Sequence, residues 1–137
     1  MGDYLSPKFD KIPGEISTLA LAHLGDAVFE LMARTYLCKT GTLTAKKLHD
    51  GTVAMVSAPA QAQAADIILP LLTEDEITVY KRGRNTQTNH VPKGCTMQQY
   101  NSATGLEALF GFLYISGNIK RLNDLFEATI TGTPFSK

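Results

Sequence analysis

Apolar residues recur at three- and four-residue intervals along most of the chain, which is the pattern of helices with one apolar face. Two long stretches show it most strongly, residues 15–38 and residues 96–116. No stretch alternates convincingly between apolar and polar residues with a period of two, as a half-buried strand would. The pattern therefore predicts an all-α protein.

Four shorter helices are predicted between and after these two, each from a capping residue at its start. They span residues 44–49, 57–69, 73–82 and 118–130, with Thr44, Ser57, Thr73 and Asn118 as N-caps. Thr73 also forms a capping box with Glu76, and Gly51 is expected to end the helix that Thr44 begins. Residues 83–94 are rich in Gly, Asn, Thr and Pro without periodicity, so they predict a loop.

The chain has 137 residues, a length that fits one domain and leaves little room for a second. We expect residues 1–14 to be an N-terminal lead-in, residues 15–130 to form one bundle-like domain of about six helices, and residues 131–137 to be a tail. No apolar run approaches the ~18–20 residues of a membrane span, and the first residues lack the apolar core of a secretory signal. Two isolated cysteines predict reduced thiols and no zinc site, so a cytoplasmic protein is expected.

Charge is distributed unevenly although the chain as a whole is neutral, with 13 basic and 13 acidic residues. Neutrality alone argues against a protein that binds nucleic acid through bulk positive charge. Residues 77–106, however, contain four basic residues and no acidic one, so this stretch has a charge of +4 and the remainder −4. Lysine, arginine and amide side chains there are suited to phosphate contacts, and the candidate nucleic-acid-binding residues are Lys81, Arg82, Arg84, Asn85 and Lys93. The alternative is an ordinary solvated loop.

Acidic residues interrupt the two most apolar predicted helices. Asp26 is followed by Glu30 one turn later on the same face, and Glu107 lies in the second long helix. An aspartate inside a helix is locally unfavourable, and Gly25 beside it costs roughly 1 kcal/mol more relative to alanine. Such acids could converge on Mg²⁺, which prefers oxygen ligands. The alternative is that they are exposed or paired with bases, as Glu30 could pair with Arg34.

Two sequence motifs suggest a family. LAHLGDAVFE at residues 21–30 resembles the signature helix of the ribonuclease III endonuclease domain, and TGLEALFGFLY at residues 104–114 resembles its later E-A-L-x-G segment. The intervening VSAPAQA and KRGRN segments are similar to the compact, mini-ribonuclease III form of the family, which lacks the separate double-stranded-RNA-binding domain. The resemblance extends over roughly residues 15–130.

This resemblance implies an all-α endonuclease domain that acts as a homodimer and cleaves double-stranded RNA with Mg²⁺, for which Mn²⁺ can substitute. The products would have 5′-phosphate and 3′-hydroxyl ends, and the expected substrate is the 23S ribosomal RNA precursor in the cytoplasm. By the same resemblance Asp26 and Glu107 would be the catalytic metal ligands. The helix at residues 15–38 is a candidate dimer seam, or else the central buried helix.

The chain departs from the larger enzymes of the family at three acidic positions. Leu19 and Ala22 stand where those enzymes have glutamates, and Thr104 stands where they have an aspartate. We therefore expect one Mg²⁺ rather than two, with Glu30 and Thr104 as candidate supporting residues around it. The same departures leave open a catalytically inactive double-stranded-RNA-binding module, and a helical adaptor with an incidental basic loop remains a third hypothesis.

Overall fold

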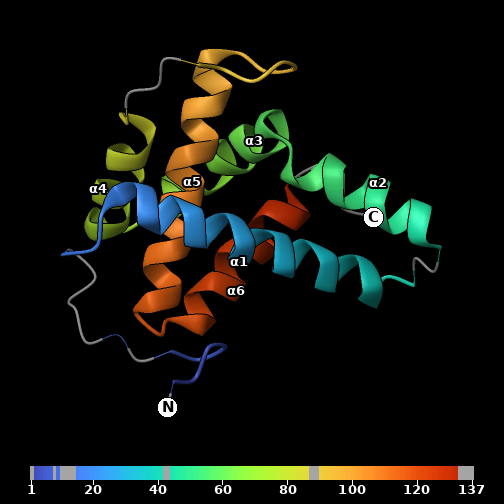
Figure 1. Cartoon of the computed structure of the whole chain (residues 1–137), viewed down its shortest axis with the longest axis horizontal. Coiled ribbons are helices and arrows are strands. Elements are labelled where there is room, and N and C mark those ends of the chain that lie inside the picture. Colours follow the sequence, from blue (N-terminus) through green and yellow to red (C-terminus); the bar gives the residue numbers. More distant parts are fainter. Residues whose placement is uncertain (1, 8, 10–14, 42–43, 87–89, 133–137) are drawn as a thin grey trace.

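The structure is a computed structural model that describes residues 2–7, 9, 15–41, 44–86 and 90–132. Over these ranges it is built from helices and contains no strand, which confirms the all-α prediction (Figure 1). Its elements in chain order are α1 (Thr18–Lys39), α2 (Ala45–Val56), α3 (Ala58–Ile68), the short 3₁₀ helix η2 (Leu69–Leu71), α4 (Glu74–Arg84), α5 (Met97–Ile115) and α6 (Ile119–Thr131). None of the described helices is both long and apolar enough to cross a bilayer.

Helix α5 is the central element of the domain, and α1, α3, α4 and α6 pack around it (Figure 1). Nine of its residues are buried, on nearly every side of the helix. Its Phe110 ring lies 5.2 Å from the ring of Phe29 in α1, which in turn lies 5.5 Å from the ring of Phe126 in α6. These three aromatic side chains join the central helix to two of its neighbours in one core.

Helix α1 is buried along one face only. Its buried residues are Leu21, Ala22, Gly25, Phe29 and Ala33, spaced by one, three or four positions as one helix face requires. The opposite face is exposed and contains large apolar side chains. The sequence left open whether α1 is the central buried helix. It is not, because α5 has that position.

Two glycines predicted to interrupt helices lie inside them. Helix α2 continues through Gly51 to Val56, because Gly51 packs closely against the side chain of Leu37 in α1. Helix α4 likewise continues through Gly83 to Arg84, where Gly83 is in close contact with Gly105 of α5. In both places helix–helix packing outweighs the low helix propensity of glycine.

The predicted N-caps are all present, and the ends of the domain are only partly described. Thr44, Ser57, Thr73 and Asn118 each accept a backbone hydrogen bond at the start of their helices. Helix α1 begins three residues later than predicted because Ser17 caps it. Residues 1, 8 and 10–14 of the expected lead-in, 87–89 of the expected loop and 133–137 of the expected tail lie outside the described residues.

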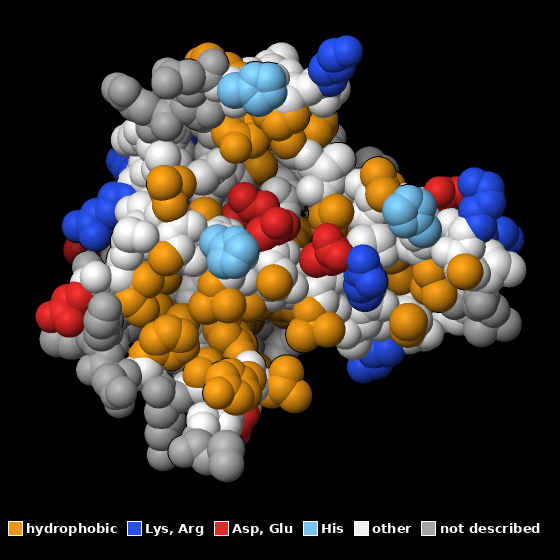
Figure 2. Space-filling view, in the orientation of Figure 1, with side chains coloured by type: hydrophobic (Ala, Val, Ile, Leu, Met, Phe, Trp, Pro, Cys, Tyr) orange, Lys and Arg blue, Asp and Glu red, His pale blue; other side chains and the backbone are white. Residues whose placement is uncertain are grey.

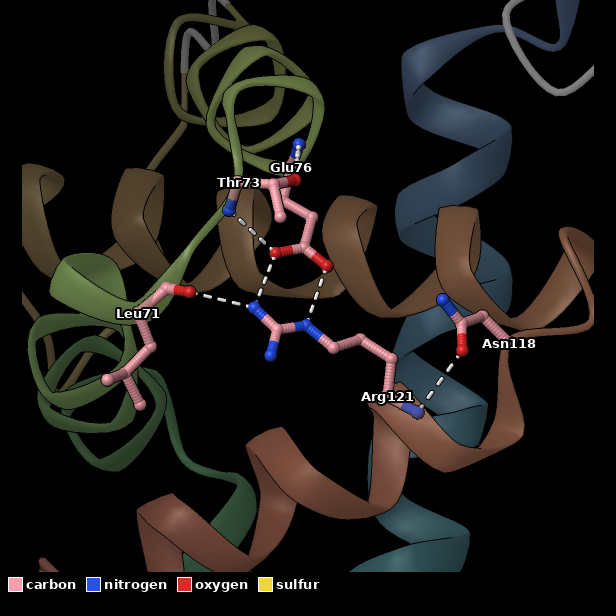
Figure 3. Close-up of polar contacts among 5 residues, drawn as sticks. All are labelled: Leu71, Thr73, Glu76, Asn118 and Arg121. Carbon is pink, nitrogen blue, oxygen red and sulfur yellow. Dashed lines mark hydrogen bonds and ion pairs between the residues drawn. The ribbon is translucent and has the colours of Figure 1, made fainter.

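A partly buried ion pair fixes the start of α4 against α6 (Figure 3). Glu76 is 5% exposed, and its two carboxylate oxygens accept hydrogen bonds of 2.8 Å from Arg121. Glu76 also closes the capping box with Thr73, and Arg121 donates to the carbonyl oxygen of Leu71. The guanidinium beside Glu76 lowers the pKa of that carboxyl, so the pair stays ionised and joins the start of α4 to α6.

Candidate active site

The candidate site is built where α1 crosses α5 with almost no side chain between the two backbones. A Cβ atom on Gly25 would overlap the carbonyl oxygen of Glu107, and one on Gly111 would overlap the carbonyl oxygen of Leu21. Only glycine permits so close an approach of two helices. Because Asp26 follows Gly25 directly, this crossing brings its carboxylate beside that of Glu107.

The two carboxyl groups interact strongly with each other. Asp26 is exposed and Glu107 is half-buried. Burial raises the pKa of Glu107 to about 8, and the charge of Asp26 and a hydrogen bond with Asp26 add to this effect. Near neutral pH, and without a cation, the pair therefore holds a proton on Glu107.

A cleft of about 500 Å³ opens over these acids. Its walls come from α1, the α2–α3 junction, the loop before α5, and α5 itself, which supplies Tyr100, Ala103, Thr104 and Glu107. Lys93 is in the loop wall, so a positive side chain borders the same cleft as Asp26 and Glu107. Figure 2 shows acidic side chains gathered near the middle of this face, where α1 crosses α5, beside a broad hydrophobic area.

Gln61 is a residue of the cleft that the sequence analysis did not identify. It is 2% exposed on α3, and its amide lies near enough to Glu107 to lower the pKa of that carboxyl. Even so, among the described residues its Nε2 has no partner within hydrogen-bonding geometry. The sequence does contain a signal, because Gln61 shares a helix face with the buried apolar residues Ala64, Ala65 and Ile68.

The two candidate supporting residues, Glu30 and Thr104, line different clefts. Glu30 forms an ion pair with Arg34, 2.7 Å between Oε2 and Nη2, as the alternative interpretation expected. It borders a second cleft, on the outer face of α1, that also includes Asp26. Thr104 lines the main cleft one turn before Glu107 and donates its hydroxyl proton to the carbonyl oxygen of Tyr100.

The other candidate RNA-binding residues lie at the end of α4, apart from the lining of the main cleft. Lys81, Arg82 and Arg84 are in its last turn, where positive charge also favours the helix dipole. Arg84 lies over the ring of Tyr80, 5.9 Å from its centre, and donates to the side-chain oxygen of Asn85, the C-cap residue. Lys93 is thus the one candidate among these five that borders the acidic cleft.

The acid pair is chemically suited to Mg²⁺. The donors are carboxylate oxygens. Burial and then the charge of Asp26 raise the pKa of Glu107, and a divalent cation would favour the ionised form of this carboxyl. Within the described ranges no group of three or more His, Cys, Asp or Glu residues forms a potential metal site. Mg²⁺ is commonly held by one or two carboxylates plus water and phosphate oxygens, so two acids are sufficient for it.

Comparisons with known proteins point to one family. The ribonuclease III domain model matches residues 19–118, most of the chain. A Mini-ribonuclease 3 from a Thermoanaerobacter species is 42% identical over 115 residues, covering 84% of this chain and 81% of that protein. The Mini-ribonuclease 3 of Acholeplasma laidlawii is 44% identical over 115 residues, covering 82% and 90% of the two chains.

A solved structure shares the fold. The crystal structure of a Fusobacterium nucleatum protein matches with a TM-score of 0.79 and 31% sequence identity, covering 86% of this chain and 96% of that one. The family match begins within α1 and ends just after α5, so it includes both helices of the acidic crossing. The chain therefore belongs to the ribonuclease III family of endoribonucleases.

Proposed function

We propose that this protein is a Mg²⁺-dependent endoribonuclease that hydrolyses phosphodiester bonds of double-stranded RNA, leaving 5′-phosphate and 3′-hydroxyl ends. The observation that supports this most is the meeting of Asp26 and Glu107 in a cleft that Lys93 also borders. These two acids come from the two motifs by which the chain resembles its family.

In the proposed reaction Asp26 and Glu107 hold the cation, and Mn²⁺ can replace Mg²⁺. When bound, the cation supplies Lewis-acid chemistry, lowering the pKa of water and neutralising charge on the phosphoryl group. Glu107 must first lose the proton that its burial and its neighbour Asp26 favour. Gly25 keeps the two acids together by allowing α1 to touch the backbone of Glu107.

Binding of the RNA is assigned to the basic side chains around the site. Lys93, at the cleft, is positioned to neutralise a phosphate close to the acids. Lys81, Arg82 and Arg84, with Asn85, provide further contacts from the end of α4. Such residues bind A-form duplexes by their shape, through phosphates and 2′-hydroxyl groups, rather than by base sequence.

The active form is proposed to be a homodimer that joins through the exposed face of α1. Leu19 is 62% exposed and Leu31 is 59% exposed, and Ala20 and Ala27 are exposed between them. These apolar side chains extend over about 18 Å along α1, and polar side chains such as His23 and Glu30 lie among them. A second copy would cover this face and would bring two acid pairs to the two strands of one duplex.

The natural substrate is proposed to be the precursor of 23S ribosomal RNA in the cytoplasm. This part follows from the similarity to bacterial proteins named Mini-ribonuclease 3 and from the resemblance in the sequence. It is tested by comparing the 5′ and 3′ ends of 23S RNA in bacteria with and without the gene for this protein.

The decisive experiment compares wild type with Asp26→Asn on end-labelled double-stranded and single-stranded RNA, with Mg²⁺ and with chelator. Asp26→Asn should reduce the cleavage rate by more than roughly 100-fold, because loss of partners that only orient a metal ligand already reaches that factor. Duplex binding and helical content should remain. Asp66→Asn, an exposed acid on α3, is the matched control and should cleave normally. Cleavage by wild type in excess chelator would contradict the proposal.

A catalytically inactive duplex-binding module is the second candidate. Leu19, Ala22 and Thr104 favour it, because acids occupy those positions in the larger enzymes of the family. It predicts salt-sensitive binding of duplex RNA without cleavage in any divalent cation. The same wild-type measurement separates the two candidates.

A further inference from the structure

Gln61 is the one buried side-chain polar group that lacks a hydrogen-bond partner among the described residues. It is 2% exposed and belongs to α3, which packs against α5. Its side chain lines the cleft that also contains Asp26 and Glu107. An unsatisfied donor therefore stands inside the proposed active site.

Packing alone does not account for an amide at this position. The residues three, four and seven positions later on the same face, Ala64, Ala65 and Ile68, are apolar and buried. An apolar side chain at position 61 would continue that face without burying an unpaired donor, which is unfavourable. Polar groups that break a local rule of this kind are expected at functional sites.

We propose that Gln61 is a positioning residue whose Nε2 donates a hydrogen bond to the carboxylate of Glu107 and orients it as a metal ligand. The inference rests on the proposed function, since it assigns a role within the same site. It follows a general property of metal sites, in which ligating carboxylates are held by hydrogen bonds from residues that do not touch the metal. Glu107 is half-buried and its carboxyl interacts with the amide of Gln61, whereas Asp26 is exposed.

The test is Gln61→Met, which keeps an unbranched side chain of similar length but removes the donor. Binding of Mn²⁺ alone is measured on RNA-free protein by the loss of the electron paramagnetic resonance signal of free Mn²⁺. We expect affinity to fall by about 10- to 100-fold, with kcat falling similarly and KM for duplex RNA unchanged. Gln63→Met, an exposed glutamine on the same helix, is the matched control and should behave as wild type.

A double-mutant cycle with Glu107→Gln tests whether Gln61 acts through Glu107. If it does, adding Gln61→Met to Glu107→Gln should weaken Mn²⁺ binding by no more than about twofold, because the partner is already lost. Independent, multiplying effects, or a rise in KM with kcat unchanged, would overturn the inference and indicate direct contact with RNA.

Separate measurements distinguish a loss of stability, a failure of the proposed function and a failure of the inference about Gln61. Thermal unfolding should show that Gln61→Met is as stable as wild type. If Gln61→Met is less stable, the Mn²⁺ affinity of Gln61→Leu is compared with that of wild type instead. If wild type binds Mn²⁺ but leaves duplex RNA intact, the proposed function fails while Mn²⁺ affinity still decides the role of Gln61. If wild type cleaves and Gln61→Met equals it in Mn²⁺ affinity, the inference about Gln61 is overturned and the proposed function remains.

Discussion

Glu107 keeps its proton to a higher pH than an ordinary glutamic acid because it is half-buried and has Asp26 beside it. Its pKa rises from 4.5 to about 8 in the folded protein. The unfolded chain releases this proton near the lower value. The folded state therefore binds more protons between these limits, and this determines the direction of two pH effects.

The first effect is on stability without metal. The stabilising contribution of the protonated group is complete below pH 4.5 and is lost as pH rises through about 8, so the free energy of unfolding should fall over that range. Urea unfolding in chelator at several pH values measures it. Glu107→Gln should abolish the dependence, whereas Asp26→Asn should only reduce it, because burial is the larger cause of the raised pKa. An equally steep profile in Glu107→Gln would contradict the assignment to this carboxyl.

The second effect is on metal affinity, and it has the opposite sign. Because the carboxyl must lose its proton to bind a cation, Mn²⁺ affinity should rise by about tenfold per pH unit and level off above about pH 8. Calorimetric titration of the RNA-free protein tests this. A flat affinity between pH 6 and 8 would show that Glu107 does not ligate the ion.

Individual site residues differed in how far the sequence could identify them. Asp26 and Glu107 are candidates from the sequence because each is an acid within an apolar helix. Gln61 was missed because an amide in an alanine-rich segment does not reveal its burial until the helix face is known. Lys93 could not be distinguished from Lys81 by sequence, since only the path of the loop brings it to the cleft.

At the level of elements, the sequence could predict where helices begin but not where helices cross. N-caps could be predicted because they depend on a local hydrogen bond, from a backbone N–H to the side chain of the residue three positions earlier. The continuation of α2 through Gly51 and of α4 through Gly83 could not, because those glycines are held by contacts with α1 and α5. Gly25 looked like a local weakness in its helix, yet it is the contact that brings α1 onto α5.

Gly25→Ala tests the crossing. The new Cβ would meet backbone of α5 rather than a flexible side chain, so destabilisation of about 3 kcal/mol is expected, the upper part of the usual range for overpacking. Cleavage by the folded fraction should also fall, since the displaced atoms belong to Glu107. Urea unfolding and single-turnover cleavage measure the two effects.

Gly51→Ala is the matched control for that variant. Its Cβ would approach only the side-chain carbons of Leu37, at 3.1 Å, and alanine favours a helix interior. Its stability should change by less than about 1 kcal/mol, with normal cleavage. Equal behaviour of the two variants would contradict a special role for the α1–α5 contact.

At the scale of the whole molecule, zero net charge conceals a basic cluster at the end of α4 and one lysine, Lys93, at the acidic cleft. Changing Lys81, Arg82, Arg84 and Lys93 together to glutamine should weaken duplex binding and reduce the salt dependence of log Kd by about 0.9 for each lost phosphate contact. Lys93→Gln alone should lower cleavage more than binding because it borders the acids. Lys120→Gln, on α6, is the control, and unchanged binding by the fourfold variant would place the RNA elsewhere.

The proposed homodimer joins through the exposed apolar side chains of α1, among them Leu31. Leu31→Glu should place an unpaired carboxylate in that interface, at a cost of about 3 kcal/mol or more, which raises the dimer Kd by more than about 100-fold. Light scattering should find a dimer for wild type and a monomer for the variant, and cleavage of both strands in one encounter should be lost. Leu71→Glu, at a residue of η2 that is similarly exposed at 52%, should leave the oligomeric state of wild type unchanged. A Leu31→Glu monomer that still cuts both strands together would show that one copy of the site is enough.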